Sequence, residues 1–191
     1  MDRRELLKMI VAATGAAMIG LPALAQGQAP VAGAKTPFSD VDVGTLDEIA
    51  ETILPRTATP GAKDAGAGLF MARFVADCYT ARQQATFRAG LADIDKRAGG
   101  RFVALAPQAR TELLRALDAE ARKHAVDVTE TGTAEEGERM PHYFTMIKQL
   151  AIFGFFTSKV GATEVLRYVA VPGRYDGELA YVPGTPAWGT S

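Results

Sequence analysis

The sequence is poor in the residues that form disulfides and metal sites. Its 191 residues include one cysteine, Cys78, and two histidines, His124 and His142. A single thiol excludes a disulfide within the chain, a four-thiolate zinc site and an iron–sulfur cluster held by this chain alone. The Cys-x-x-Cys-His motif of c-type cytochromes is also absent, so the chain does not carry covalent haem. Packing must therefore stabilise the fold.

An excess of either sign of charge is absent as well. Lysine and arginine number 21 and aspartate and glutamate 22, which gives a net charge of -1. Nucleic-acid binding needs clustered positive charge, so we expect no nucleic-acid partner. With 48% hydrophobic and 23% charged residues, the composition is that of a globular domain with a core, and it excludes a disordered chain or a multi-span membrane protein.

The first 25 residues have the organisation of a secretory signal, with a charged start, an apolar stretch and small residues at the end. The start resembles the twin-arginine (Tat) export motif, which is matched by Arg3, Arg4, Leu6, Leu7 and Lys8. Ala23 and Ala25 mark the predicted cleavage site. A retained anchor is the alternative, but Thr14, Gly15, Gly20 and Pro22 interrupt the stretch, which falls short of the roughly 20 strongly apolar residues that span a bilayer. The Tat pathway moves folded proteins, so the sequence predicts a periplasmic protein whose export accompanies a cofactor loaded in the cytoplasm.

Residues 26–37 are predicted to be a flexible leader, and residues 38–191 a single all-α domain, a small bundle of five to six helices. In no stretch do apolar and polar residues alternate strictly enough to predict a strand. Apolar residues recur at helical spacing in the predicted helices, which cover about Val41–Leu54, Phe70–Cys78, Phe87–Ala98, Pro107–His124 and Pro141–Ser158, with a further short helix within Gly161–Val169. Ser39 and Asp40 can cap the first helix, and Gly99-Gly100 ends the third.

Three segments are predicted to lack regular structure. Residues 57–68 form a turn-rich loop, which lacks the lysine of a phosphate-binding loop because Ala67 stands at that position. Residues 125–140 form an acidic loop on the surface, and residues 171–191 an extended tail rich in proline, glycine and aromatic residues.

We find no predicted active site. His124 and His142 each follow a glutamate by four residues, whereas a di-iron bundle needs Glu-x-x-His, so ordinary helix-surface pairs are favoured. No serine lies in a Gly-x-Ser-x-Gly motif. Cys78 is predicted to be a buried small hydrophobe, with an intermolecular disulfide as the alternative.

The C-terminal part of the chain is the candidate partner interface. From about Leu150 the last long helix is apolar nearly all round, which predicts either a central core helix or a helix partly covered by another protein. Aromatic and arginine side chains on a proline-stiffened tail are typical interface anchors. The candidate interface residues are Phe153, Phe155, Phe156, Tyr168, Pro172, Gly173, Arg174, Tyr175, Asp176, Gly177 and Trp188. The alternative is that the tail wraps the chain's own helices.

Several motifs together resemble the small subunit of membrane-bound gluconate 2-dehydrogenase, the subunit 3 family. They are the Tat signal, Ile53-Leu54-Pro55, Thr59-Pro60-Gly61-Ala62 with Asp64-Ala65-Gly66, Gly154-Phe155-Phe156-Thr157-Ser158, and the tail from Val171 to Gly177. The resemblance implies a chain without flavin or haem. It also implies a large flavoprotein partner of the glucose-methanol-choline (GMC) type that holds FAD, and a cytochrome c subunit that holds haem c.

The resemblance further implies that the small subunit helps the flavoprotein to mature and carries it through the Tat translocase. The favoured hypothesis is therefore a non-catalytic accessory subunit of a periplasmic sugar or sugar-acid dehydrogenase complex. One alternative is an independent exported enzyme or ligand-binding protein that uses Glu138, His142 or an aromatic pocket. Another is a helical protein that self-associates through its aromatic helix. The substrate stays open, because its contacts would lie on the other subunit.

Overall fold

The structure is a computed structural model that describes residues 37–131, 140–171, 173, 177–180 and 182–189, with only the backbone of residues 126–131. The predicted export signal and cleavage site, from Arg3 to Ala25, lie outside the described residues, and so does the predicted leader as far as residue 36. The fold below is that of the unit from Thr36 onward.

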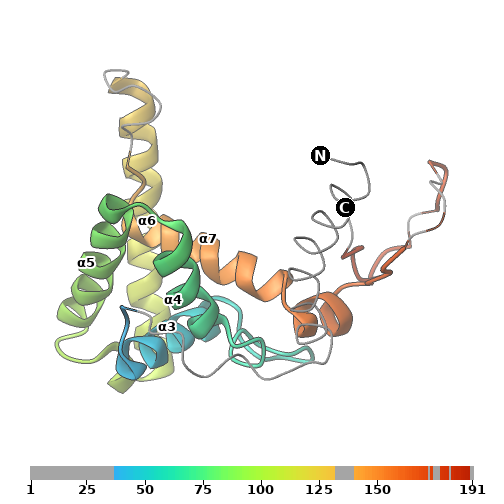
Figure 1. The fold of residues 1–191 in the computed structure, drawn as a ribbon, viewed down its shortest axis with the longest axis horizontal. Helices are drawn as coiled ribbons and strands as arrows, with labels where there is room; N and C mark the ends of the chain where they lie inside the picture. The colour runs from blue at the N-terminus through green and yellow to red at the C-terminus, as the bar shows by residue number, and fades with distance from the viewer. Residues whose placement is uncertain (1–36, 132–139, 172, 174–176, 181, 190–191) are drawn as a thin grey trace, which may run out of the picture. The chain divides into compact units, whose positions relative to one another are not determined.

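The described chain is all helical, as predicted (Figure 1). The α-helices are α3 (Asp40–Ile53), α4 (Ala67–Cys78), α5 (Ala81–Arg97), α6 (Pro107–Thr131) and α7 (Tyr143–Phe156). A short 3₁₀-helix, η1 (Phe102–Ala104), precedes α6, and a π-helical turn, η2 (Gly161–Val165), follows α7. Within the described ranges there is no strand, and an isolated bridge joins Arg167 to Trp188.

Local hydrogen bonds set the helix ends. The Ser39 hydroxyl accepts the Asp42 N–H and the Asp42 carboxylate accepts the Ser39 N–H at 2.9 Å, a capping box at the start of α3. Thr80 and Gln83 form the same arrangement at the start of α5, which the sequence analysis did not predict. At the end of α5, Gly99 has φ of 69° and its N–H donates to the Lys96 carbonyl, while Gly100 donates to Asp95. These bonds form a Schellman motif, as the glycine pair predicted.

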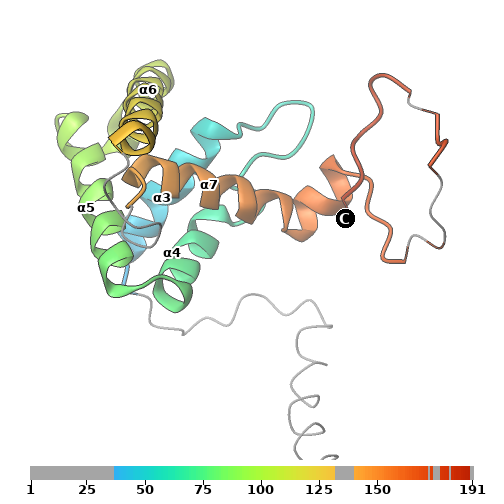
Figure 2. The ribbon, with the colours of Figure 1, turned by 90° about the horizontal axis from the view of Figure 1, so that it is seen from above.

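Helix α7 is the central helix of the bundle, because it contacts α3, α4, α5 and α6 (Figures 1 and 2). Seven of its fourteen residues are buried, namely Phe144, Met146, Ile147, Leu150, Ala151, Gly154 and Phe155. Of the two alternatives predicted for this helix, the structure shows the central core helix. Two residues near its end, Ile152 and Phe153, remain exposed.

Two glycines allow the other helices to approach α7 closely. A Cβ atom at Gly90 of α5 would collide with the Tyr143 ring, and one at Gly154 of α7 would lie 2.5 Å from Cδ1 of Phe70 in α4. Cores packed at this density tolerate added methyl groups poorly, because the surrounding side chains are held in place. The sites of closest approach therefore have no room for a larger residue.

The structure corrects two predictions. Cys78 is exposed, because it is the last residue of α4 and the buried residues of that helix end at Val75. The predicted acidic loop begins later than residue 125, since α6 continues to Thr131. The reason is that no glycine or proline interrupts the chain between Pro107 and Gly132, and a polar helix surface needs no apolar period.

We expect Gly90→Ala to destabilise the protein by about 1 to 3 kcal/mol, because the added methyl group overpacks the contact of α5 with Tyr143. The matched control is Gly44→Ala in α3, where nothing lies within 4 Å of the added Cβ. That change should stabilise the helix by roughly 0.5 to 1 kcal/mol. Urea unfolding followed by circular dichroism measures both, and equal stability of the two variants would contradict the packing argument.

Candidate partner interface

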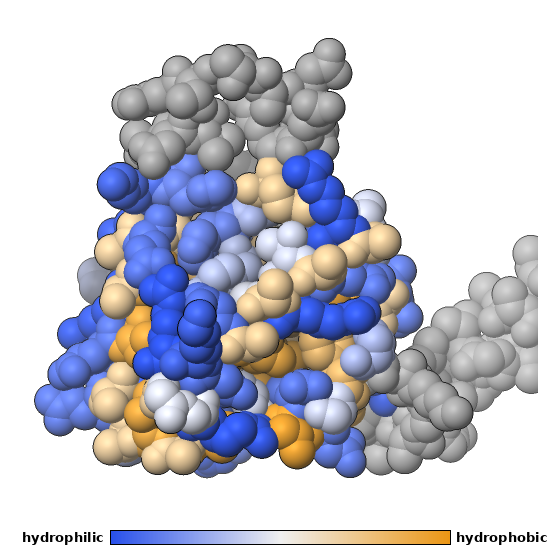
Figure 3. Space-filling view, turned by 90° about the vertical axis from the view of Figure 1, so that its left-hand side faces the viewer, coloured by the Kyte–Doolittle hydropathy of each residue, from blue (hydrophilic) through white to orange (hydrophobic). Residues whose placement is uncertain are grey.

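Exposed large hydrophobic side chains gather in the C-terminal part of the described chain. Apart from Val41, all of them lie between Ile152 and Trp188 in the sequence. We call this set the C-terminal apolar surface; it consists of Ile152, Phe153, Tyr168, Val169, Val171, Leu179, Val182 and Trp188. By contrast, the face that Figure 3 presents, over α5 and α6, is mostly hydrophilic, with hydrophobic residues in small separate patches.

Helix α4 holds Phe153 in place although the side chain is 48% exposed. The Phe153 ring lies 5.8 Å from the Phe70 ring and 5.9 Å from the Phe74 ring, measured between centroids. Both α4 rings pack in turn against the core. An exposed aromatic ring with fixed neighbours loses little side-chain entropy when another protein covers it, so Phe153 is suited to binding.

The tail closes into a loop, drawn in red in Figure 2. The Arg167 N–H donates to the Ala187 carbonyl at 2.8 Å, and the Gly189 N–H donates to the Arg167 carbonyl at 2.8 Å. The Arg167 guanidinium also lies 4.2 Å from the centre of the Trp188 ring, a cation–π contact. The segment between Arg167 and Trp188 is therefore a loop with joined ends.

This loop encloses a hollow of about 480 Å³. Its lining includes Leu179, Val182, Pro186 and Trp188, together with the guanidinium of Arg167. The described part of the lining is mostly apolar, so it can accept an apolar segment of another polypeptide.

The predicted interface residues have different environments. Phe153, Tyr168 and Trp188 are exposed, as are Gly173 and Gly177, and Phe156 is half-buried against the core. Phe155 is only 3% exposed and belongs to the chain's own core, so its placement at an interface is corrected. The reason is that Phe155 lies on the face of α7 that packs within the bundle, whereas Phe153 lies outside it. The predicted residues Pro172, Arg174, Tyr175 and Asp176 lie outside the described residues.

Sequence reasoning missed several exposed aliphatic residues, among them Val169, Val171, Leu179 and Val182. It also missed the contact of Arg167 with Trp188. The sequence did contain a signal for their exposure. The segment is too rich in proline and glycine for a helix or a strand, so its aliphatic residues do not form the apolar face of a helix that could pack into a core.

A polar cluster joins α5, α6 and the start of α7. The Tyr143 hydroxyl donates to Asp93 at 2.6 Å, and Arg97 donates to both Asp93 and Glu120 at 2.7 Å. These bonds lower the pKa values of Asp93 and Glu120 and raise that of Arg97, because each stabilises a charged form. Glu120 therefore pairs with Arg97, whereas the sequence analysis paired it with His124.

The two histidines lie together beside this cluster, with ring centres 5.8 Å apart. A ring nitrogen of His124, Nε2, lies 3.1 Å from the Met140 carbonyl oxygen. His142 caps α7, since its Nδ1 accepts the Phe144 N–H at 3.2 Å. Among the described residues, no three histidine, cysteine or acidic side chains are grouped so that they could hold a metal ion. Glu138, which the sequence paired with His142, lies outside that part of the chain.

The pKa of His142 is lowered, chiefly because the ring is partly buried and next because it faces His124. Arg97 lowers this pKa further, while Glu120 and Asp93 oppose the shift. Protonation at Nδ1 would also remove the acceptor that caps α7 and place positive charge at the helix N-terminus, which is unfavourable. The neutral ring is therefore the form that fits the fold.

We expect His142 to make the protein less stable below about pH 6.5, the usual histidine value. The unfolded chain binds the proton more readily, so the contribution is complete above that pH and is lost as the pH falls towards the lowered folded-state pKa. His142→Asn keeps a capping side chain without titrating. Urea midpoints at pH 5.5 and 7.5 should differ less for this variant than for the wild type; an unchanged difference would contradict the assignment.

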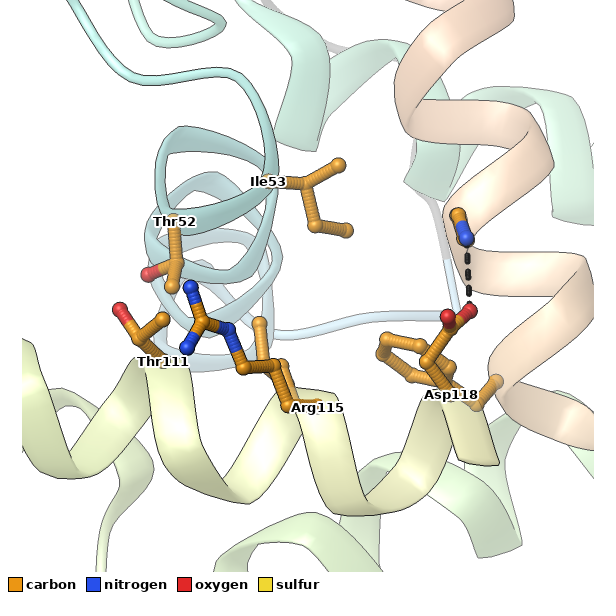
Figure 4. Close-up of a pocket in the computed structure, with 8 residues that line it drawn as sticks. Thr52, Ile53, Thr111, Arg115 and Asp118 are labelled. Carbon is orange, nitrogen blue, oxygen red and sulfur yellow. Dashed lines mark hydrogen bonds and ion pairs between the residues drawn. The ribbon is translucent and has the colours of Figure 1, made fainter. Parts of the chain in front are cut away.

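A second hollow, of about 240 Å³, lies between α3, α6 and α7 (Figure 4). Its apolar lining is Ile53, Leu114 and Phe144. At one end Lys148 donates to Asp118 at 2.6 Å, and this bond lowers the pKa of the carboxylate. Asp118 also pairs with Arg122, so its charge is balanced by two cations. A carboxylate with a lowered pKa is a weak general base.

Comparison with known proteins identifies the chain. The sequence model of the family described as gluconate 2-dehydrogenase subunit 3 matches residues 41–173, which is most of the chain. The chain belongs to the gluconate 2-dehydrogenase subunit 3 family. The match covers α4 to α7 and all of α3 except Asp40, and it reaches Gly173, so it includes Phe153 and the start of the tail but not Trp188.

This membership confirms the resemblance on which the sequence analysis relied. The family is named for a subunit of a dehydrogenase, so a subunit 3 chain is one component of a larger assembly. Searches of the curated proteins and of the solved structures gave no match. In the described part of the chain, no helix has the length and hydrophobicity needed to cross a membrane.

Proposed function

We propose that this chain is a non-catalytic accessory subunit of a periplasmic, FAD-dependent sugar or sugar-acid dehydrogenase of the gluconate 2-dehydrogenase type. It binds the GMC-type flavoprotein subunit, supports its maturation and carries it through the Tat translocase. In this proposal FAD belongs to the flavoprotein, and haem c to a cytochrome c subunit where the complex contains one.

The observation that carries the proposal is the C-terminal apolar surface. Its members gather at two places: Leu179, Val182 and Trp188 line the hollow of the tail loop, and Phe153 lies against Phe70 and Phe74. Exposed apolar side chains that gather in this way are typical of binding sites for proteins. Family membership supplies the kind of partner, a dehydrogenase subunit. The twin-arginine sequence supplies the route, since Tat export suits a cofactor-loaded partner.

The direct test is co-expression of the flavoprotein subunit with and without this chain. We expect the flavoprotein to reach the periplasm with bound FAD only when the chain is present. Unchanged export and flavin content in its absence would contradict the proposal. The chain purified alone should show no dehydrogenase turnover, and turnover without a partner would favour an independent enzyme instead.

Phe153→Asp should weaken the complex with the flavoprotein about tenfold or more, because an aromatic side chain that the partner covers in the complex would be replaced by a charge. The matched control is Val41→Asp, which puts the same charge on an exposed apolar residue outside the C-terminal apolar surface. That variant should bind like the wild type. Affinity measured by calorimetry checks both, and equal losses for the two variants would contradict this use of Phe153.

Replacing Arg3 and Arg4 together with lysine should leave both this chain and the flavoprotein in the cytoplasm, because lysine does not replace the arginine pair that defines the signal. Cell fractionation with antibodies against the two subunits measures the outcome. Export of the flavoprotein by this double variant would show that the two proteins travel separately.

A further inference from the structure

The connection between α3 and α4 is long for two helices that pack against each other. Thirteen residues separate Ile53 from Ala67, whereas connections within helical bundles usually have about two to eight. Longer connections in a small domain are commonly functional. We call residues 55–66 the α3–α4 loop.

Carboxylates hold this loop in one conformation. One oxygen of Glu51 accepts the Arg56 N–H and the other accepts the Lys63 N–H, both at 2.9 Å. Within the loop, Asp64 accepts the Gly61 N–H at 2.8 Å. At the start of α4, Asp47 accepts the Gly68 N–H at 2.7 Å. Bonds to ionised acceptors are stronger than neutral ones, so α3 acts as a rigid support for the loop.

Further contacts fix the base of the loop. A Cβ atom at Gly61 would collide with the Glu51 carboxylate, so only glycine allows this approach. Glu48 forms ion pairs with both Lys63 and Arg110, which ties the loop to α6. Partial burial raises the pKa of Asp47, and the Gly68 N–H opposes that shift. Ordering a loop costs conformational entropy, and these contacts meet that cost before any partner binds.

The base of the loop is buried at Gly61 and Ala62, whereas its tip is exposed. Pro55, Arg56, Thr57, Ala58 and Thr59 are all exposed, although the Thr57 N–H donates to the Thr59 carbonyl at 3.0 Å. None of these side chains lies in the core of the bundle. The rigid tip therefore contributes little packing to the fold, which leaves recognition of another molecule as a use for it.

The loop lies next to the C-terminal apolar surface. It ends at Gly66, within about one helical turn of Phe70, and the Phe70 ring contacts Phe153. Figures 1 and 2 agree in placing the loop at the same end of the bundle as η2. A polar, exposed element beside an apolar patch is the usual arrangement of rim and core in a protein interface.

We infer that the α3–α4 loop is a second docking element, the polar rim that contacts the same dehydrogenase subunit as Phe153. This inference rests on the proposed function. A standard interface uses about 20 to 30 residues on each side. The described part of the chain gives the C-terminal apolar surface eight large apolar residues, and a preformed neighbouring loop is suited to supply further contacts.

The test uses Ala58→Arg, which adds a long charged side chain at the exposed tip without touching the anchoring carboxylates. The matched control is Ala89→Arg, at an exposed alanine of α5 on the other side of the bundle. We expect Ala58→Arg to weaken binding of the flavoprotein about tenfold or more and Ala89→Arg to leave it unchanged. Urea unfolding confirms that both variants fold.

A second measurement requires no variant. Amide hydrogen exchange of residues 56–59 should slow by about tenfold or more when the flavoprotein binds, since a rim that is covered loses solvent access. If the wild type forms no complex, the proposed function fails. If the wild type binds, but Ala58→Arg binds equally well and exchange of the loop is unchanged, the docking role of the loop is overturned while the proposed function stands.

Discussion

The fold depends on covering a helix that is apolar on nearly all sides. Helix α7 has almost no polar face over its second half, so α3, α4, α5 and α6 all pack against it and bury half of its residues. This requirement explains the glycines at the contacts with α4 and α5, because close approach removes more apolar surface from water. The order of the helices along the chain matters less than their shared contact with α7.

The same requirement accounts for the candidate interface. Near the end of α7, Gly154 and Phe155 are buried in the bundle, but Ile152 and Phe153 remain exposed beside α4. The tail that follows closes on itself through Arg167 and Trp188 and exposes more apolar side chains. A chain that leaves its most hydrophobic helix partly uncovered is well suited to membership of an assembly, as its family implies.

Much of the fold could be predicted, because helical periodicity and capping are local. The cap of α3 at Ser39 and the end of α5 at Gly99 and Gly100 follow from neighbouring residues. The apolar character of α7 followed from its own residues, but its central place was one of two alternatives. Cys78 was placed wrongly because helical spacing gives the side of the helix on which a residue lies, but not how far along the helix the core extends. The end of α6 was placed too early because polar helices continue without an apolar period.

By itself, the sequence determined the helical class, the family and the segment in which exposed aromatic residues gather, since these depend on residue type and spacing along the chain. The tertiary structure was needed to show that Phe153 is exposed while Phe155 is buried. It was also needed to show the contact of Arg167 with Trp188 and the hydrogen bonds by which Glu51 holds the α3–α4 loop. Those outcomes depend on which faces of distant segments meet, and the period of a single helix does not contain that information.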